Sequence, residues 1–182
     1  MKYEFIHDDT IIYNKVKLTR IRCIKHISHF AYPGKIGGYI ENENNLSHEG
    51  NCWVGEEAKV YGTGRVMKNA QVRQSAQVFD GGVVTDDGFV NGRSIVCSGG
   101  KVCKKALVEH CGFVVHGAVA SQNTINITGF VDPITVTDDH ITVGTKTMTF
   151  DKWVKLIDRW QGRKLPVTAI MCGIRMAKVR TA

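Results

Sequence analysis

The chain has 182 residues and a formal net charge of +7, with 24 lysines and arginines against 17 aspartates and glutamates. A chain of this length can bury a core, and its positive charge disfavours DNA mimicry and favours an acidic partner. We find no secretory signal and no apolar run long enough to span a membrane, so we expect a cytoplasmic protein. The six cysteines include no Cys-x-x-Cys pair, which predicts reduced thiols and gives no support to a metal site.

Residues 1–53 are predicted to form an N-terminal β cap, with strands over residues 2–6 and 10–27. In the second segment apolar and polar residues alternate up to Leu18, and the phase then slips by one residue, so that Ile21 occupies an apolar position. A slip of one residue turns the two faces of a strand over, so we predict a β-bulge or a strand break near Thr19–Arg20. The glycines and asparagines that follow predict turns.

A six-residue repeat dominates the middle of the chain. Valine recurs at every sixth position from Val54 to Val114, and Ala120 takes the next position. The residue four positions after each valine is small, and alternation along a strand places it on the same side as the next valine. Each hexad therefore predicts a short strand and a polar corner, and three hexads predict a triangular coil of eighteen residues. The inward residue is predicted to be small because the corner has no room for a branched side chain.

Stacked coils place residues eighteen apart above one another, which predicts three faces. The face that carries Val60, Val78 and Val96 is unusually apolar on its outer side. Apolar columns of this size are not expected to remain in water, so we predict that the C-terminal helices or a second subunit cover them, in a dimer or a trimer. The candidate interface residues are Tyr61, Phe79, Ile95, Cys97, Phe113 and Val115. A second apolar column contains Trp53, Phe89 and Leu107.

Residues 126–182 are predicted to form a C-terminal cap. Alternation in residues 134–143 around Asp138–His140 predicts a β-hairpin. A helix is predicted to start at Thr149 or Asp151 and to end at Gly162, with a second helix after Pro166. We expect both helices to pack on the end or the flank of the coils.

The hexads over residues 54–125 resemble the hexapeptide-repeat, left-handed β-helix family. The segments Gly37–Ile40, Asn45–Ser47, Gly50–Asn51 and Trp53–Val54 resemble the lead-in of a poorly characterised bacterial and prophage group with this repeat. The resemblance implies a mainly β fold: a parallel left-handed β-helix of about four triangular coils, with an N-terminal β cap and a C-terminal hairpin and helical cap. The left hand comes from the resemblance alone, because the general rule for parallel crossovers favours the right hand.

Enzymes of the hexapeptide family that transfer acyl groups use a histidine as general base. His110 and His116 occupy turn positions here, and no loop interrupts residues 54–120. We therefore predict a non-catalytic, cofactor-free protein that binds a macromolecule. The prophage resemblance suggests a phage accessory protein that blocks a host protein or protein–nucleic-acid complex. The alternatives are acyl transfer to a small acceptor, with these histidines as catalytic candidates, and a structural assembly module.

Two groups of basic residues are candidates for contact with nucleic acid or an acidic protein. For both groups we prefer the interpretation of an ordinary solvated surface with counter-charges. The groups are Arg159, Arg163 and Lys164 near the C-terminus, and Lys101, Lys104 and Lys105 in the coils.

Overall fold

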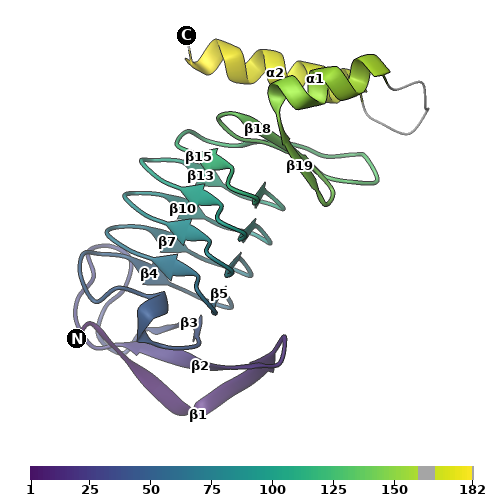
Figure 1. Cartoon of the computed structure of the whole chain (residues 1–182). Coiled ribbons are helices and arrows are strands. Elements are labelled where there is room, and N and C mark those ends of the chain that lie inside the picture. The colour runs from purple at the N-terminus through teal and green to yellow at the C-terminus, as the bar shows by residue number, and fades with distance from the viewer. Residues whose placement is uncertain (160–166, 182) are drawn as a thin grey trace.

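The computed structural model describes residues 1–159 and 167–181. Parallel coils stack into a β-solenoid, with a β-hairpin at its N-terminal end and a sheet with two helices at its C-terminal end (Figure 1). This architecture confirms the predicted fold class: a mainly β chain whose coils are stacked parallel strands, with a cap on each side.

The coils consist of two-residue strands that alternate among three faces. The pairs Val54–Val72 and Val90–Val108 lie directly opposite each other, which confirms the eighteen-residue stacking. The inward valines are at most 1% exposed and form the core of the solenoid. The strands are β4 (Trp53–Val54), β5 (Lys59–Val60), β6 (Arg65–Val66), β7 (Gln71–Val72), β8 (Gln77–Val78), β9 (Val83–Val84), β10 (Phe89–Val90), β11 (Ile95–Val96), β12 (Lys101–Val102), β13 (Leu107–Val108), β14 (Phe113–Val114) and β15 (Val119–Ala120).

The corners between these strands share one conformation. The residue two positions after each valine has a positive φ, from Glu56 at 58° to His116 at 54°. A hydrogen bond closes most of these tight turns, as from the amide of Gly64 to the carbonyl of Tyr61 (3.0 Å). A positive φ at the first central residue is typical of type I′ and II′ turns. A Cβ atom at Gly100 would lie 1.9 Å from the carbonyl oxygen of Val114, so the predicted lack of room at the corner is confirmed there.

The N-terminal cap begins with a long antiparallel hairpin. Strand β1 (Tyr3–Tyr13) pairs with β2 (Val16–Cys23), which pairs with β3 (Ile36–Ile40). We predicted one strand over residues 10–27, but Asn14 and Lys15 adopt positive φ angles and turn the chain between β1 and β2. The β1–β2 register shifts between Ile6 and Thr10, directly opposite Thr19 and Arg20, and the β2–β3 register shifts between Arg20 and Arg22. The predicted irregularity is thus confirmed.

Parallel pairing starts below the regular repeat. Ile40 pairs with Val60, and Leu46 bridges Val66, so both extend the inward columns by an incomplete lower coil. Leu46 and Val54 are eight residues apart rather than six, so two extra residues lie in the segment between them. The short 3-10 helix η1 (Glu43–Asn45) ends at a fully buried asparagine, whose amide group donates to the carbonyls of residues 62 and 64.

The C-terminal cap is an antiparallel sheet covered by two helices. The sheet contains β16 (Ile125–Ile127), β17 (Ile134–Val136), β18 (His140–Val143) and β19 (Lys146–Thr149), and the helices are α1 (Phe150–Arg159) and α2 (Val167–Thr181). The predicted hairpin is confirmed as β17 and β18, and two further strands flank it. Trp160, Gly162 and Pro166, which figured in the helix prediction, lie outside the described residues.

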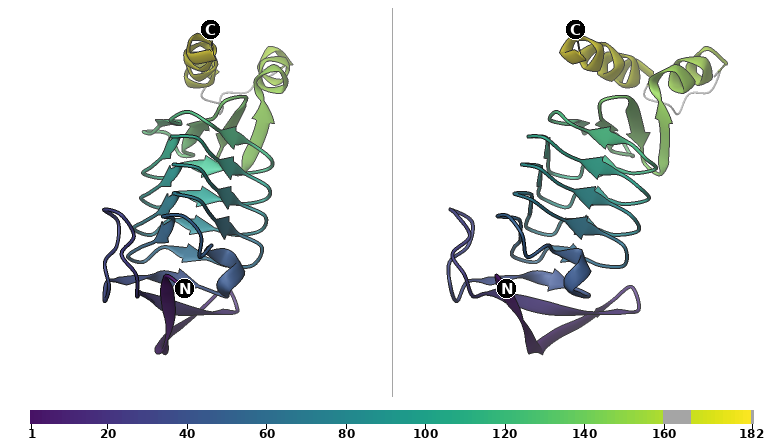
Figure 2. Two further views of the ribbon diagram at one scale, coloured as in Figure 1. Left: turned by 90° about the vertical axis from the view of Figure 1, so that its left-hand side faces the viewer. Right: turned by 60° about the vertical axis from the view of Figure 1, so that its left-hand side comes forward.

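The helices lie beyond the end of the solenoid and not along its outer faces (Figure 2). Trp153 of α1 and Ile170 and Ile174 of α2 pack against β17 and β18, and the indole Nε1 of Trp153 donates to the carbonyl of Ile141 (2.8 Å). The top coil is sealed by the strands and loops of this cap. The amide of Phe113 donates to Thr135 Oγ1 (3.0 Å), for example, so the last strand edge is not left open.

Candidate interaction surface

The predicted interface residues lie on one side of the solenoid. They come from β5, β8, β11 and β14 or directly follow these strands, and Ile95 lies opposite Phe113 in the parallel register. Because the neighbouring valines point inward, these side chains point outward. We call Tyr61, Phe79, Ile95, Cys97, Phe113 and Val115 the outer apolar face.

The N-terminal hairpin covers the lower part of this face. Tyr61 is only 6% exposed, and its ring stacks on Phe79 with the centroids 4.9 Å apart. The ring of Tyr13, at the tip of the hairpin, meets Tyr61 edge-on at 5.9 Å, and its hydroxyl donates to Gln77 Oε1 (3.1 Å). Asn14 Nδ2 donates to the Tyr61 hydroxyl (3.1 Å). We expected the C-terminal helices or a second subunit to cover this face, but the first cover comes from the chain's own N-terminus.

The upper part of the outer apolar face lies beyond the hairpin. The hydrophobic cluster formed with the hairpin extends along this face as far as Phe79. Ile95, Cys97 and Phe113 are partly buried and keep some exposure, whereas Val115 is only 7% exposed. Burial raises the pKa of the Cys97 thiol, so this side chain stays uncharged and behaves as a small apolar group. The upper part is therefore a flat, uncharged surface on a rigid sheet.

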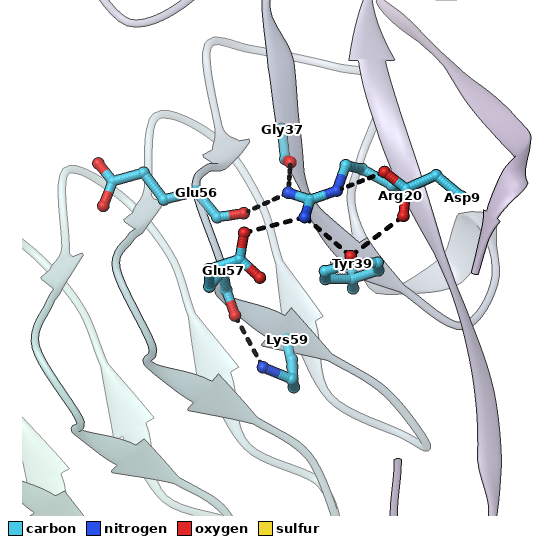
Figure 3. A network of polar contacts seen from close by, with 7 residues as sticks. All are labelled: Asp9, Arg20, Gly37, Tyr39, Glu56, Glu57 and Lys59. Atoms are coloured by element: carbon cyan, nitrogen blue, oxygen red, sulfur yellow. Dashed lines mark hydrogen bonds and ion pairs between the residues drawn. The ribbon is translucent and has the colours of Figure 1, made fainter. Parts of the chain in front are cut away.

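A polar network fixes the hairpin to the lower coils (Figure 3). Arg20 of β2 lies 2.9 Å from a carboxylate oxygen of Asp9 and 2.9 Å from one of Glu57, and its side chain is only 14% exposed. Its guanidinium group stacks over the ring of Tyr39, 4.1 Å from the centroid, and donates to the Tyr39 hydroxyl (2.8 Å). Burial alone lowers the pKa of Arg20, but the hydrogen bond to Glu57 and the negative charges nearby raise it overall.

The same guanidinium group also satisfies the backbone. It donates to the carbonyl oxygens of Gly37 (3.1 Å) and Glu56 (2.9 Å), so it joins β2, β3 and the first regular corner. Its fixed planar set of donors suits this role. The sequence alone does not identify Arg20 as a key residue. Its partners lie up to 37 residues away in the chain, so no local pattern predicts these contacts. The one hint in the sequence is that an arginine stands at the predicted bulge.

The two candidate catalytic histidines do not come together. His110 and His116 follow β13 and β14, so they lie at successive corners of the top coil, and both are exposed. In the part of the chain that the structure describes, no group of three or more histidine, cysteine or acidic side chains could hold a metal ion. His110 Nδ1 lies 3.7 Å from the carboxylate of Glu109. This distance is too long for the hydrogen bond that would orient a general base.

The basic candidates are exposed but partly compensated. Lys101, Lys104 and Lys105 are exposed on the coils. Asp86 lies one coil below Lys104, accepts from its backbone amide (2.9 Å) and forms an ion pair with Lys68 (2.8 Å). These alternating charges weaken the local positive potential. Arg159 is exposed at the end of α1, and Arg163 and Lys164 lie outside the described residues.

A loop of the N-terminal cap covers the lower part of the second apolar column. Trp53 is fully buried, and the loop of residues 24–35 contributes Ile27 and Ala31 to the same hydrophobic cluster. The guanidinium group of Arg73 lies 5.5 Å from the ring of Phe30 in this loop and 5.8 Å from that of Phe89. The lower part of this column is therefore not an open binding surface.

A shallow depression of about 650 Å³ lies at the lower end of the solenoid. Its lining combines Glu43 and Glu49 with Arg65 and Lys68, and Lys68 is already paired with Asp86. Because acidic and basic side chains are mixed in this open depression, it favours neither an anionic nor a cationic ligand. None of the described helices is both long and apolar enough to cross a membrane.

Comparison with protein-family models and with curated proteins gave no match for this chain. The resemblance to hexapeptide-repeat proteins and to the prophage group therefore stays a prediction from sequence, and so does the left hand of the coils. At the coarser level the structure shows a β-solenoid of stacked parallel coils.

Proposed function

We propose that this protein is a non-catalytic binding protein that contacts another macromolecule through the upper part of its outer apolar face. The observation that supports the proposal is the row of partly exposed apolar side chains Ile95, Cys97 and Phe113, which continues upward from the part that the hairpin covers. The hairpin shields the apolar side chains of the lower part from water, so we expect a partner to shield those of the upper part.

The face is preorganised for binding. Ile95 and Phe113 lie on adjacent hydrogen-bonded strands, and the valines behind them are completely buried. Little backbone entropy is therefore lost when a partner binds, so most of the apolar contact energy can contribute to affinity. A flat, uncharged surface of this kind fits a partner of the same character.

The first partner that we propose is a second copy of this chain. Two copies carry a net charge of +7 each, so they repel one another except where an uncharged patch allows close approach. An apolar, flat patch is complementary to itself and satisfies a closed two-fold interface. A host protein, as the prophage resemblance suggests, would use the same face as a competing partner. Lys101 and Lys104 are a weaker basis for nucleic-acid binding because Asp86 accepts from the Lys104 amide and adds a negative charge to that column.

Light scattering of the full-length protein at concentrations up to about 100 μM tests the proposal. We expect the wild type to be a dimer and Phe113→Glu to be a monomer with a nearly unchanged thermal midpoint, because this side chain points away from the core. The matched control is Phe130→Glu, which changes an equally apolar side chain that is 48% exposed in the loop between β16 and β17, and which we expect to remain dimeric. A monomeric wild type, or equal loss of association in both variants, would contradict the proposed interface.

A further inference from the structure

Lys2 and Cys52 form a buried pair at the lower end of the solenoid. Lys2 is 3% exposed and Cys52 is completely buried. The Nζ atom of Lys2 donates to the Sγ atom of Cys52 (3.1 Å), and it also lies within hydrogen-bond distance of the carbonyl oxygens of Glu49 (3.3 Å) and Gly50 (3.4 Å). No ion pair of the described residues includes Lys2. A buried amine is thus held directly against a buried thiol without a carboxylate.

Neighbouring contacts hold the amine in this position. The ring of Tyr3, the next residue, stacks on the ring of His48 with the centroids 4.4 Å apart, and its hydroxyl donates to the carbonyl of Leu46 (3.0 Å). The backbone amide of Lys2 lies 3.4 Å from His48 Nδ1. Cys52 comes from the irregular lower coil, and its amide donates to the carbonyl of Lys68 (2.7 Å). Two segments fifty residues apart therefore present the nitrogen and the sulfur to each other.

Packing alone does not account for this pair. Burying a lysine amine without a carboxylate is unfavourable, and lysine is almost never fully buried unless it is paired. A methionine has a similar length and would fill the same space without that penalty. Burial raises the pKa of the Cys52 thiol, whereas the neighbouring Lys2 lowers it. Of the side chains near Cys52, the Lys2 amine is therefore the one that both favours the reactive thiolate and can attack an oxidised sulfur.

We propose that Lys2 and Cys52 are an oxidative cross-linking site, at which a peroxide converts the pair into a covalent sulfenamide. In the first step the Cys52 thiolate attacks the peroxide. A sulfur–oxygen bond forms, the oxygen–oxygen bond breaks, and the hydroxide that leaves takes a proton from the Lys2 ammonium group and becomes water, which leaves the amine neutral. The sulfur is oxidised by two electrons to a sulfenic acid, and the peroxide is reduced.

In the second step the neutral Lys2 amine attacks the same sulfur. A nitrogen–sulfur bond forms, the sulfur–oxygen bond breaks, and the hydroxide leaves with the nitrogen proton as a second water. One thiol, one amine and one hydrogen peroxide thus give one sulfenamide and two waters. The bond fastens the start of β1 to the lower coil, and a thiol reductant reverses it. This site lies at the N-terminal end of the solenoid, at the opposite end from Phe113, so the inference is independent of the proposed function.

Cys23 is the competing partner that an experiment must separate. It is 1% exposed in β2, and Lys2 lowers the pKa of its thiol as well, although burial has the larger effect and raises it. A Cys23–Cys52 disulfide removes two hydrogens, as the sulfenamide does. The two products differ in the number of remaining thiols: a disulfide consumes two, and the sulfenamide consumes one.

The test treats the folded full chain with hydrogen peroxide, denatures it, alkylates the free thiols and measures the intact mass. We expect the main oxidised product to have lost two hydrogens and to accept one alkyl group fewer than the six that the reduced chain accepts. Trypsin should then fail to cleave after Lys2, and a peptide that joins Lys2 to Cys52 should appear and should vanish on treatment with dithiothreitol. Cys23→Ser should retain this product. Lys2→Arg, which keeps the charge, and Cys52→Ser should both abolish it.

Three results would overturn the inference, and each is read from the wild type itself. The first is a product that has lost two thiols, with a Cys23–Cys52 peptide. The second is a product in which Cys52 is oxidised further, to sulfinic or sulfonic acid, and trypsin still cleaves after Lys2. The third is a Cys52 that remains reduced when peroxide has oxidised the exposed Cys172.

Discussion

The tightest contact between coils predicts the effect of adding a single methyl group at Gly100. A Cβ atom there would lie 1.9 Å from the carbonyl oxygen of Val114, whereas real Cβ contacts essentially never fall below 3.0 Å. Gly64 and Gly82 occupy the same position in the lower coils, with distances of 2.4 and 2.2 Å to the carbonyl oxygens above them. In the top coil this position is Ala118, and no further coil of the solenoid stacks above it. The glycines are thus required by the next coil and not by their own backbone conformation.

The size of the effect follows from two opposing contributions. Gly100 does not have a positive φ, so alanine fits its backbone, and the lower entropy of the unfolded chain would by itself stabilise Gly100→Ala by about 0.4–1 kcal/mol. The steric conflict acts in the other direction. The carbonyl of Val114 accepts a hydrogen bond from the amide of Cys97 (3.2 Å), so relieving the conflict means separating two coils. Because a distance of 1.9 Å is so short, we expect the upper end of the usual cost of overpacking, about 3 kcal/mol, and hence a net loss of about 2 kcal/mol.

Thermal unfolding followed by circular dichroism measures this loss. A net loss of this size lowers the midpoint by roughly 4–8 °C for a chain of this length. Ala118→Gly is the first control and should cost less than about 1 kcal/mol. Gly117→Ala is the second: nothing lies within 4 Å of its Cβ position, but its φ of +76° should cost about 1–2 kcal/mol. If Gly100→Ala melts at or above the wild-type midpoint, close stacking does not determine the glycines of this column.

Three further predictions concern the cap and the histidines. Arg20→Met leaves Asp9 without its ion-pair partner and should lower the free energy of unfolding by about 2 kcal/mol; an unchanged urea midpoint would contradict its anchoring role. Burial lowers the pKa of His48, so the unfolded chain takes up the extra proton more readily, and the wild type should lose stability below its ordinary value of 6.5. His48→Gln should lose less over the same pH range, and parallel losses would refute the assignment. Acetyl-coenzyme A with amine and sugar acceptors should show no turnover; turnover abolished in His110→Ala or His116→Ala would support acyl transfer instead.

The repeat could be predicted from the sequence because its physics is local. A valine every sixth residue determines which side chains point inward, and stacking then places Val78 below Val96 without any long-range information. The phase slip before Ile21 located the irregularity near Arg20 by the same kind of argument. Periodicity also located the apolar outer face, because the outward positions follow from the inward ones.

Contacts between distant segments could not be predicted in this way. Neither the cover that Tyr13 provides for Tyr61 nor the ion pair between Arg20 and Glu57 depends on a period, since both join parts of the chain more than thirty residues apart. The alternation of residues 10–27 continued through the hairpin turn, and so the turn at Asn14 was missed. The candidate interface was consequently too long, and its lower part belongs to the folded chain itself.

The cover over the lower part of the outer apolar face makes a final prediction. Tyr13 supplies this cover through its ring, which meets Tyr61, and through its hydroxyl, which donates to Gln77. Tyr13→Ala should cost about 2 kcal/mol, less than a fully buried aromatic residue, because Tyr13 is only half-buried. It should also expose Tyr61 and increase the fluorescence of the apolar dye bis-ANS. Tyr13→Phe keeps the ring and should cost only about 0.5–1.5 kcal/mol with no gain in dye binding. If Tyr13→Ala binds no more dye than Tyr13→Phe, the hairpin does not protect this face, and the boundary that we draw between its covered and its open part is wrong.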